Sequence, residues 1–181
     1  MPAEISVTPL SQLDYIAYVD GQGLLPSQFA GQVGAYAIFA ADYSLQYVGY
    51  SRDIYLSLKQ HLVRQPQLCH WIKLQMIDRP SRTALEQIQA AWISENETVP
   101  PGNAGDRHTW EQPIDVKANM TPAERAGYTD PQLEEIAQQK ILKNAARRIE
   151  AEILAVLQAR HLQEPLRFNP KLKDNGVLDL K

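Results

Sequence analysis

The residues Gly34-Ala35-Tyr36-Ala37-Ile38-Phe39 are followed by a short polar turn, Asp42-Tyr43-Ser44, and then by Tyr47-Val48-Gly49. Small, apolar and aromatic residues fill both runs, and consecutive side chains of a strand point to opposite faces. Runs of this composition joined by a short turn are typical of an antiparallel hairpin. The stretch therefore predicts two paired strands, over residues 33–39 and 45–50.

Two tyrosines and two glycines set this hairpin apart. Gly34 and Gly49 fall inside the predicted strands, where glycine often marks the close approach of a ligand or of another backbone. Tyr36 and Tyr47 could therefore place two phenol hydroxyls on one open surface. The alternative is an ordinary hairpin with two core aromatics, and the hairpin alone favours that alternative.

The residues after the hairpin predict a helix, a strand and a second helix. Ser51 or Asp53 can cap a helix over 53–65, because apolar residues then recur at helical spacing. A strand follows over 70–77, and proline breaks it at position 80. Ser81 can cap the second helix, which runs to residue 96, and Pro100-Pro101-Gly102-Asn103 finishes the segment.

This order of elements resembles the GIY-YIG nuclease superfamily over residues 31–103. The resemblance rests on Gly34, Tyr36, Tyr47, Val48, Gly49, His61, Trp92-Ile93 and Asn103. Two short runs, Tyr47-Val48-Gly49-Tyr50-Ser51-Arg52 and Pro100-Pro101-Gly102-Asn103, look most like a plant and cyanobacterial subgroup. That subgroup includes the N-terminal domain fused to a plastid glutaredoxin. The resemblance implies an α/β (α+β) fold, with a three-stranded mixed sheet flanked by helices.

The family mechanism is metal-assisted hydrolysis of a phosphodiester, in which the metal offsets the charge that develops on the phosphoryl group. The resemblance implies catalytic roles for Tyr36 and Tyr47, with His61 behind them on the first helix. Asn103 would order the site. Gly34 and Gly49 would lie where substrate approaches.

Two charged residues of the family mechanism are replaced by neutral ones. Ser57 stands where active relatives have an arginine, and Gln89 stands where they have a metal-binding glutamate. A glutamine carbonyl is a poor anchor for Mg²⁺, which usually relies on one or two carboxylates. Arg52 and Glu86 could compensate, Arg52 as a phosphate ligand at the start of the first helix. We expect Mg²⁺ or Mn²⁺ to bind weakly, if at all, with Glu86 as ligand.

Two functions remain open. The first is a GIY-YIG endonuclease-like protein whose hydrolysis of DNA is weak or degenerate, and the retained tyrosines and Asn103 favour it. The second is a non-catalytic module that binds nucleic acid or protein on the same scaffold. The neutral residues Ser57 and Gln89 favour the second function.

Composition narrows the class of protein. The 181 residues are 44% hydrophobic and 22% charged, which is ordinary for a globular chain, and the net charge is −3. That charge argues against avid, general binding of DNA. The single cysteine, Cys69, lies in no C-x-x-C or monothiol redox motif. With one cysteine, we expect a reducing, cytoplasmic location. We expect no membrane association, because no apolar run approaches 18 residues.

The flanking regions give a coarser prediction. Residues 1–30 are expected to form an N-terminal extension with a helix over 9–20. Residues 104–181 are expected to pack on the central domain as a loop followed by a long helix and a tail. That loop is predicted over 97–119, and the helix over 131–161. The basic cluster Lys140, Lys143, Arg147 and Arg148 on this helix could contact phosphates, but a solvated face with local ion pairs is favoured.

Overall fold

The predicted hairpin is formed by β2 (Gly34–Phe39) and β3 (Leu45–Ser51), which pair antiparallel. The structure is a computed structural model that describes residues 5–181. The turn between the strands is tight enough to place Tyr43 at a φ of 65°, in the left-handed region. The register shifts between Ile38 and Phe39, because Ile38 lies opposite Tyr47 and Phe39 opposite Leu45, which leaves Gln46 as the one extra residue of a bulge in β3.

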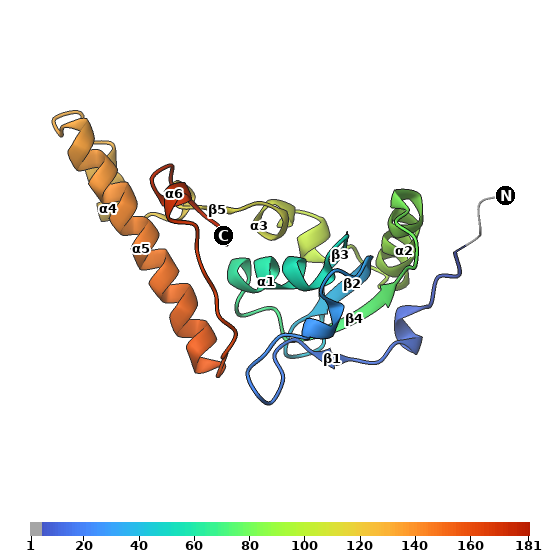
Figure 1. The fold of residues 1–181 in the computed structure, drawn as a ribbon. Helices are drawn as coiled ribbons and strands as arrows, with labels where there is room; N and C mark the ends of the chain where they lie inside the picture. Colours follow the sequence, from blue (N-terminus) through green and yellow to red (C-terminus); the bar gives the residue numbers. More distant parts are fainter. Residues whose placement is uncertain (1–4) are drawn as a thin grey trace. The chain divides into compact units, whose positions relative to one another are not determined.

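The hairpin belongs to a four-stranded sheet with the order β1-β4-β2-β3 (Figure 1). β4 (Trp71–Met76) pairs with β2, and the short β1 (Ile16–Ala17) pairs with β4. The α/β (α+β) class is confirmed. Every strand pair within residues 5–181 is antiparallel, so the predicted three-stranded mixed sheet gains a strand and loses its parallel pair.

The two predicted helices are α1 (Ile54–Arg64) and α2 (Arg82–Glu95), and they begin at the expected caps. Asp53 accepts a hydrogen bond from the first turn of α1, and Ser81 accepts one from the first turn of α2. Leu85, Ile88 and Trp92 of α2 pack in one core cluster with alternate residues of β2 and β3. α1 contacts the other face of the same strands, so the two helices cover opposite sides of the sheet (Figure 1).

The helix predicted over 9–20 is wrong. Two short 3₁₀ turns, η1 (Leu10–Gln12) and η2 (Ser27–Phe29), flank β1 instead. The buried Tyr18 donates its hydroxyl hydrogen to the Leu58 carbonyl, 2.5 Å away, and this bond holds the segment in an extended path across the sheet edge. Residues whose apolar spacing fits a helix form a strand here, because pairing with β4 provides hydrogen-bond partners for their backbone N–H and C=O groups. The first four residues of the predicted extension lie outside the described residues.

The long loop predicted over 97–119 is also wrong. The segment forms four short elements: η3 (Pro101–Asn103), α3 (Arg107–Glu111), β5 (Ile114–Asp115) and η4 (Lys117–Asn119). Trp110 is fully buried and anchors α3. A segment without periodicity is ordered here by one large side chain.

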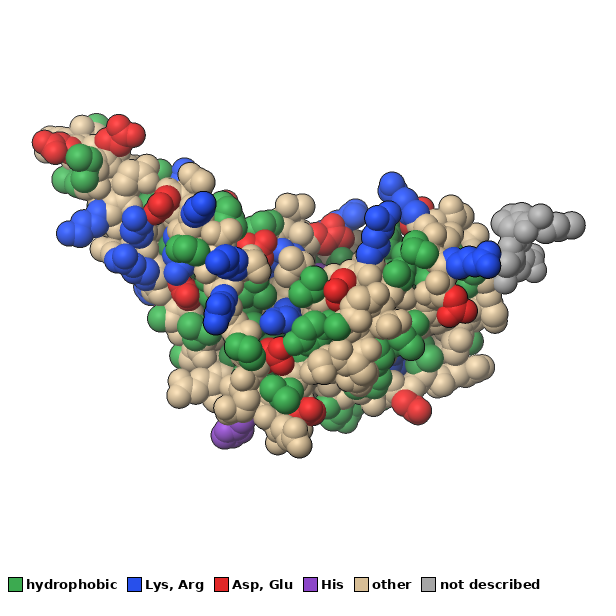
Figure 2. Space-filling view, in the orientation of Figure 1, with side chains coloured by type: hydrophobic (Ala, Val, Ile, Leu, Met, Phe, Trp, Pro, Cys, Tyr) green, Lys and Arg blue, Asp and Glu red, His purple; other side chains and the backbone are tan. Residues whose placement is uncertain are grey.

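Internal contacts divide the chain into unit 1, Met1–Glu111, and unit 2, Gln112–Lys181. Unit 2 contains α4 (Pro122–Tyr128), the long α5 (Glu135–Ala159), the short α6 (Pro170–Lys173) and β6 (Val177–Leu178), which pairs with β5. Figure 2 shows Lys and Arg side chains gathered over α5 and α6. None of the described helices is long and apolar enough to cross a membrane.

Ion pairs order this part of unit 2. Arg148 of α5 bonds Glu124 of the α4 capping box at 2.7 Å, and Lys143 bonds Asp174 at 2.8 Å. Part of the basic cluster on α5 is thus used in local ion pairs.

Candidate functional site

The two hairpin tyrosines project from the same face of the sheet. Tyr36 on β2 lies opposite Gly49, and Tyr47 on β3 lies opposite Ile38. Residues opposite one another in an antiparallel pair share a face, so both rings point toward α1. Their ring centroids are 6.4 Å apart.

Both tyrosines are buried, and their hydroxyls are bonded within unit 1. The Tyr36 hydroxyl lies 2.9 Å from Nε2 of His61, a residue of α1. The Tyr47 hydroxyl donates to Oε1 of Glu111, on α3, at 3.1 Å. Tyr36 is 2% exposed, Tyr47 5% and His61 4%. The expectation of two hydroxyls on an open surface is therefore wrong, because α1 and α3 enclose the pair.

Trp110 covers this tyrosine pair. Its ring stacks on Tyr47 with centroids 5.3 Å apart and an interplanar angle of 7°. The Trp110 carbonyl accepts a hydrogen bond from Nη1 of Arg64 at 3.1 Å, and Gln65 bonds Thr109 at 2.9 Å. The end of α1 thus holds α3 in place over the tyrosines.

Burial sets the protonation state of this cluster. It raises the pKa of the Tyr36 hydroxyl far above its usual range, and it does the same for Tyr47, with the neighbouring Tyr36 adding to the rise. Burial, and to a smaller extent the neighbouring Arg64 cation, lowers the pKa of His61 to about 3. At neutral pH both phenols therefore keep their protons and the imidazole is uncharged, so none of the three groups is poised to act as a charged acid or base.

The two strand glycines make room for protein atoms. A Cβ at Gly34 would lie 2.4 Å from the Gln75 carbonyl oxygen of β4. A Cβ at Gly49 would lie 2.5 Å from Cε1 of Tyr47 and 2.9 Å from the Tyr36 hydroxyl. The close approach that these glycines permit is therefore that of a neighbouring strand and of the tyrosine rings.

Ser57 occupies the position where the resemblance implies an arginine. Its hydroxyl donates to Oγ of Ser51 at 2.7 Å. The Ser57 side chain is also hydrogen-bonded to the Tyr36 hydroxyl. Ser51 Oγ in turn accepts from the Asp53 backbone N–H at 3.0 Å. The hydroxyl of Ser57 therefore completes a local network at the start of α1, and it brings no charge to the tyrosines.

Asn103 and Gln89 both hold the backbone of Val48 on the edge strand β3. Oδ1 of Asn103 accepts from the Val48 N–H at 2.7 Å, and Nδ2 donates to the Val48 carbonyl at 2.8 Å. Nε2 of Gln89 donates to the same carbonyl at 2.8 Å. The two amides thus take the place of a further strand at the sheet edge.

Glu86, the expected metal ligand, is paired with a cation. Its Oε1 lies 2.7 Å from Nε of Arg82 and accepts a 3.4 Å bond from the Tyr50 hydroxyl. Residues 5–181 contain no cluster of three or more His, Cys, Asp or Glu side chains that could hold a metal ion. Gln89 directs its amide hydrogens at Val48, so the neighbouring donor set is one ion-paired carboxylate. These residues do not fit a divalent cation as they stand.

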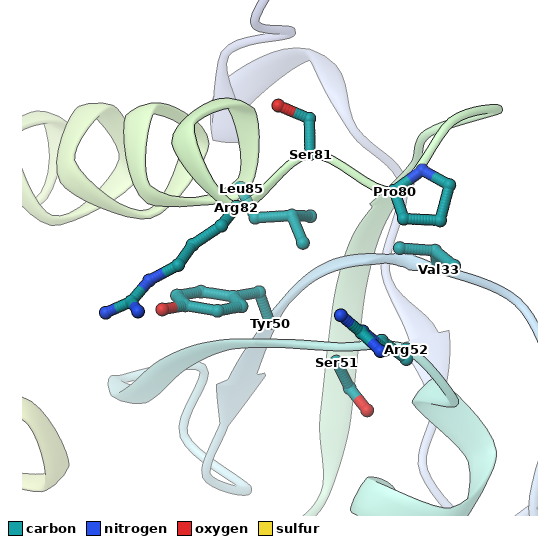
Figure 3. Close-up of a pocket in the computed structure, with 8 residues that line it drawn as sticks. All are labelled: Val33, Tyr50, Ser51, Arg52, Pro80, Ser81, Arg82 and Leu85. Atoms are coloured by element: carbon teal, nitrogen blue, oxygen red, sulfur yellow. The ribbon is translucent and has the colours of Figure 1, made fainter.

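Arg52 does not join the tyrosine pair. It lines a different pocket, of about 420 Å³, together with Tyr50 and Arg82 (Figure 3). The pocket lies where β3 and the first turn of α2 meet. The structure therefore separates the expected catalytic residues into a buried tyrosine cluster and an accessible arginine pocket.

Four residues of the tyrosine cluster and the arginine pocket were not identified from the sequence: Trp110, Glu111, Tyr50 and Arg82. Trp110 and Glu111 reach Tyr47 from more than 60 positions away in the chain, in a segment without periodicity, so no local signal could reveal them. Arg82 lies four residues before the predicted Glu86, at the spacing of a helical ion pair, and Tyr50 follows Gly49 directly; both missed residues had a sequence signal.

Comparison with known proteins gives a partial match. No family model matches the chain. The chain is 34% identical over 110 residues to the bifunctional monothiol glutaredoxin-S16, chloroplastic, of Arabidopsis thaliana. The match covers 57% of this chain, which spans only 37% of that protein's length. The expected likeness to a plastid glutaredoxin is confirmed. Membership of the GIY-YIG superfamily and the cytoplasmic location stay predictions.

Proposed function

We propose that this chain is a non-catalytic nucleic-acid-binding module on a GIY-YIG-like scaffold. The observation that supports it best is the state of the two tyrosines. Their hydroxyls are buried and bonded to His61 and Glu111, and Trp110 covers them. A base or water-positioning group must reach the reacting atom, and these hydroxyls face protein.

The neutral residues point the same way. Ser57 and Gln89 bring no charge to the site, and loss of one preorganised stabiliser of transition-state charge costs roughly 10²–10³ in rate. We propose that Mg²⁺ or Mn²⁺ binds at most weakly, because the Glu86 carboxylate is already paired with Arg82. Binding without efficient hydrolysis is the function that these residues support.

The arginine pocket is the proposed contact with nucleic acid. Arg52 and Arg82 offer guanidinium groups suited to phosphate, and Tyr50 offers an aromatic surface between them. DNA is the partner that the resemblance implies. The net charge of −3 predicts modest affinity, since unit 1 has eleven Asp and Glu residues against seven Lys and Arg.

Weak metal-dependent hydrolysis is the second candidate, and Glu111 favours it. Its carboxylate lies 3.1 Å from the Tyr47 hydroxyl and would add an anionic ligand beside the tyrosine pair. The side chain is now paired with Arg107 at 2.8 Å, so a metal would have to displace that cation.

A plasmid-nicking assay with Mg²⁺ or Mn²⁺, run beside a DNA-binding assay, tests the proposal. We expect DNA binding and little or no nicking above that of a Tyr36→Phe variant, which controls for contaminating nuclease and whose fold is checked by circular dichroism. Metal-dependent nicking lost in that variant would establish the second candidate. Absence of any nucleic-acid binding would leave a protein-interaction module as the remaining function.

A further inference from the structure

The pocket beside Arg52 has walls of two kinds. Its volume is about 420 Å³, and the residues that matter for binding are Val33, Tyr50, Arg52, Pro80, Arg82 and Leu85. Two of these side chains are cationic and the others are apolar or aromatic. A pocket of this size accepts a group as large as a nucleotide, and its lining suits a flat apolar body with anionic substituents.

Arg52 has an uncommitted guanidinium group. It makes no hydrogen bond or ion pair with any residue that the structure describes, although its neighbour Asp53 caps α1. Its charge is therefore available to a ligand.

Arg82 is only loosely committed. Its partner Glu86 lies one helical turn away, and the two side chains are 83% and 48% exposed. Exposed pairs of this kind contribute little to stability, so a phosphate can replace the carboxylate at small cost.

Tyr50 lies between the two arginines in Figure 3, with Leu85 above its ring in that view. The ring is partly buried against the core cluster that contains Leu85, so its position is fixed. A fixed aromatic ring between two cations is the arrangement by which proteins hold unpaired bases of a single strand, with the base on the ring and the phosphates on the cations.

We propose that this pocket binds one nucleotide of single-stranded nucleic acid, with the base stacked on Tyr50 and the two flanking phosphates paired with Arg52 and Arg82. The inference rests on the proposed function and names its ligand more closely. A base within a duplex is stacked between its neighbours, so it cannot lie on Tyr50. The pocket therefore discriminates single strands from duplexes.

Fluorescence anisotropy with the full chain tests this. The probes are a labelled single-stranded oligonucleotide, the duplex of the same sequence and a labelled mononucleotide. The variants are Arg52→Ala, Arg82→Ala, Tyr50→Leu and Tyr50→Phe, and Arg147→Ala on α5 is a matched control for loss of one positive charge. Thermal unfolding confirms that each variant is folded.

We expect the single strand to bind at least tenfold more tightly than the duplex. Arg52→Ala, Arg82→Ala and Tyr50→Leu should each weaken single-strand binding about tenfold, because a charged contact and a base stack contribute comparably. Tyr50→Phe and Arg147→Ala should change it less than threefold, since phenylalanine keeps the ring.

Other outcomes overturn the inference in distinguishable ways. Equal binding of single strand and duplex, or an unchanged affinity in Tyr50→Leu, would reject the stacked nucleotide and leave the proposed function in place. Binding of the labelled mononucleotide without any binding of the oligonucleotide would keep the pocket and reject nucleic acid as its source. If neither oligonucleotide nor mononucleotide bound, both the inference and the proposed function would fall.

Discussion

Tyr36 and His61 form a polar pair that unit 1 must satisfy internally. Both side chains are buried, and the hydroxyl lies 2.9 Å from Nε2. Because the imidazole is neutral, one of its nitrogens carries the proton, and the phenol can donate to Nε2 when Nδ1 carries it. A buried group that loses such a partner bears the full cost of leaving water. The tyrosine hydroxyl therefore has a stabilising role that does not depend on catalysis.

Removal of the Tyr36 hydroxyl should destabilise the fold. We expect Tyr36→Phe to lower the free energy of unfolding by about 1–3 kcal/mol, because it leaves buried Nε2 of His61 without this bond. Urea denaturation measures the change. Tyr50→Phe is the matched control: it removes a hydroxyl whose 3.4 Å bond is exposed, and it should cost at most about 0.5 kcal/mol. Equal stabilities of the two variants would show that the Tyr36 hydroxyl is not part of a buried network.

His61 should also make stability depend on pH. Its folded pKa of about 3 lies below the ordinary value of 6.5, so the unfolded chain binds the proton more readily. The stability that this histidine supports is complete above about pH 6.5 and falls as the pH drops toward 3. Between pH 7 and 5.5 we expect a loss of about 1 kcal/mol, in a range where most carboxyl groups stay ionised.

Urea denaturation at the two pH values, in the wild type and in His61→Gln, separates this contribution from other groups. The loss should disappear in His61→Gln and persist in His108→Gln, whose histidine is exposed. A loss that remains in His61→Gln would assign the pH dependence to other groups.

Among the elements, β3 shows how side chains complete a sheet. It is the edge strand, and Val48 would present an unpaired N–H and C=O to solvent without Asn103 and Gln89. Two carboxamides match the donor and acceptor of one residue, as a neighbouring strand would. At position 89, where the resemblance implies a metal-binding glutamate, the Gln89 amide supplies the hydrogen-bond donor that the Val48 carbonyl requires.

A carboxylate at position 89 should be unfavourable. Gln89→Glu replaces the group that donates to the Val48 carbonyl with one that can only accept, and we expect it to lower the free energy of unfolding by about 1–3 kcal/mol in the presence of a chelator. Urea denaturation with and without Mn²⁺ measures both stability and metal binding. Millimolar Mn²⁺ that restores the stability of Gln89→Glu, without affecting the wild type, would show that the position can still hold a metal. Tight Mn²⁺ binding by the wild type would contradict the proposed weak site.

Elements with a local signal were predicted, and those made by distant contacts were not. The hairpin, α1 and α2 follow from alternation, helical spacing and the caps Asp53 and Ser81. β1 reads as a helix because only its pairing with β4, more than 50 residues away, makes it a strand. The same reason hid Trp110 and Glu111, which enclose the tyrosines from a segment that looks like a loop.

At the scale of the whole molecule, charge limits how nucleic acid can bind. Unit 1 has seven Lys and Arg residues against eleven Asp and Glu, whereas unit 2 has eleven against ten. A nucleic acid is repelled by most of unit 1 and attracted only where arginines are local. Unit 2 offers another mainly cationic surface around a smaller cavity, which is lined by Lys143, Arg147, Lys171 and Lys173 and also by Asp174, the partner of Lys143. Salt dependence distinguishes the two surfaces, because it counts phosphate contacts.

Single-strand binding by the full chain should show a shallow salt dependence. Two phosphates, on Arg52 and Arg82, give a slope of log K against log[salt] of about −1.4, since each contact on a single strand contributes about 0.7. Titrations between low and moderate salt measure this slope. Arg52→Ala should reduce its magnitude to about half, because one counterion fewer is released. Arg147→Ala should leave it unchanged. A slope steeper than about −3 that flattens in Arg147→Ala would instead place the main contact on the lysines and arginine of unit 2, and the arginine pocket of unit 1 would then have a minor part in binding.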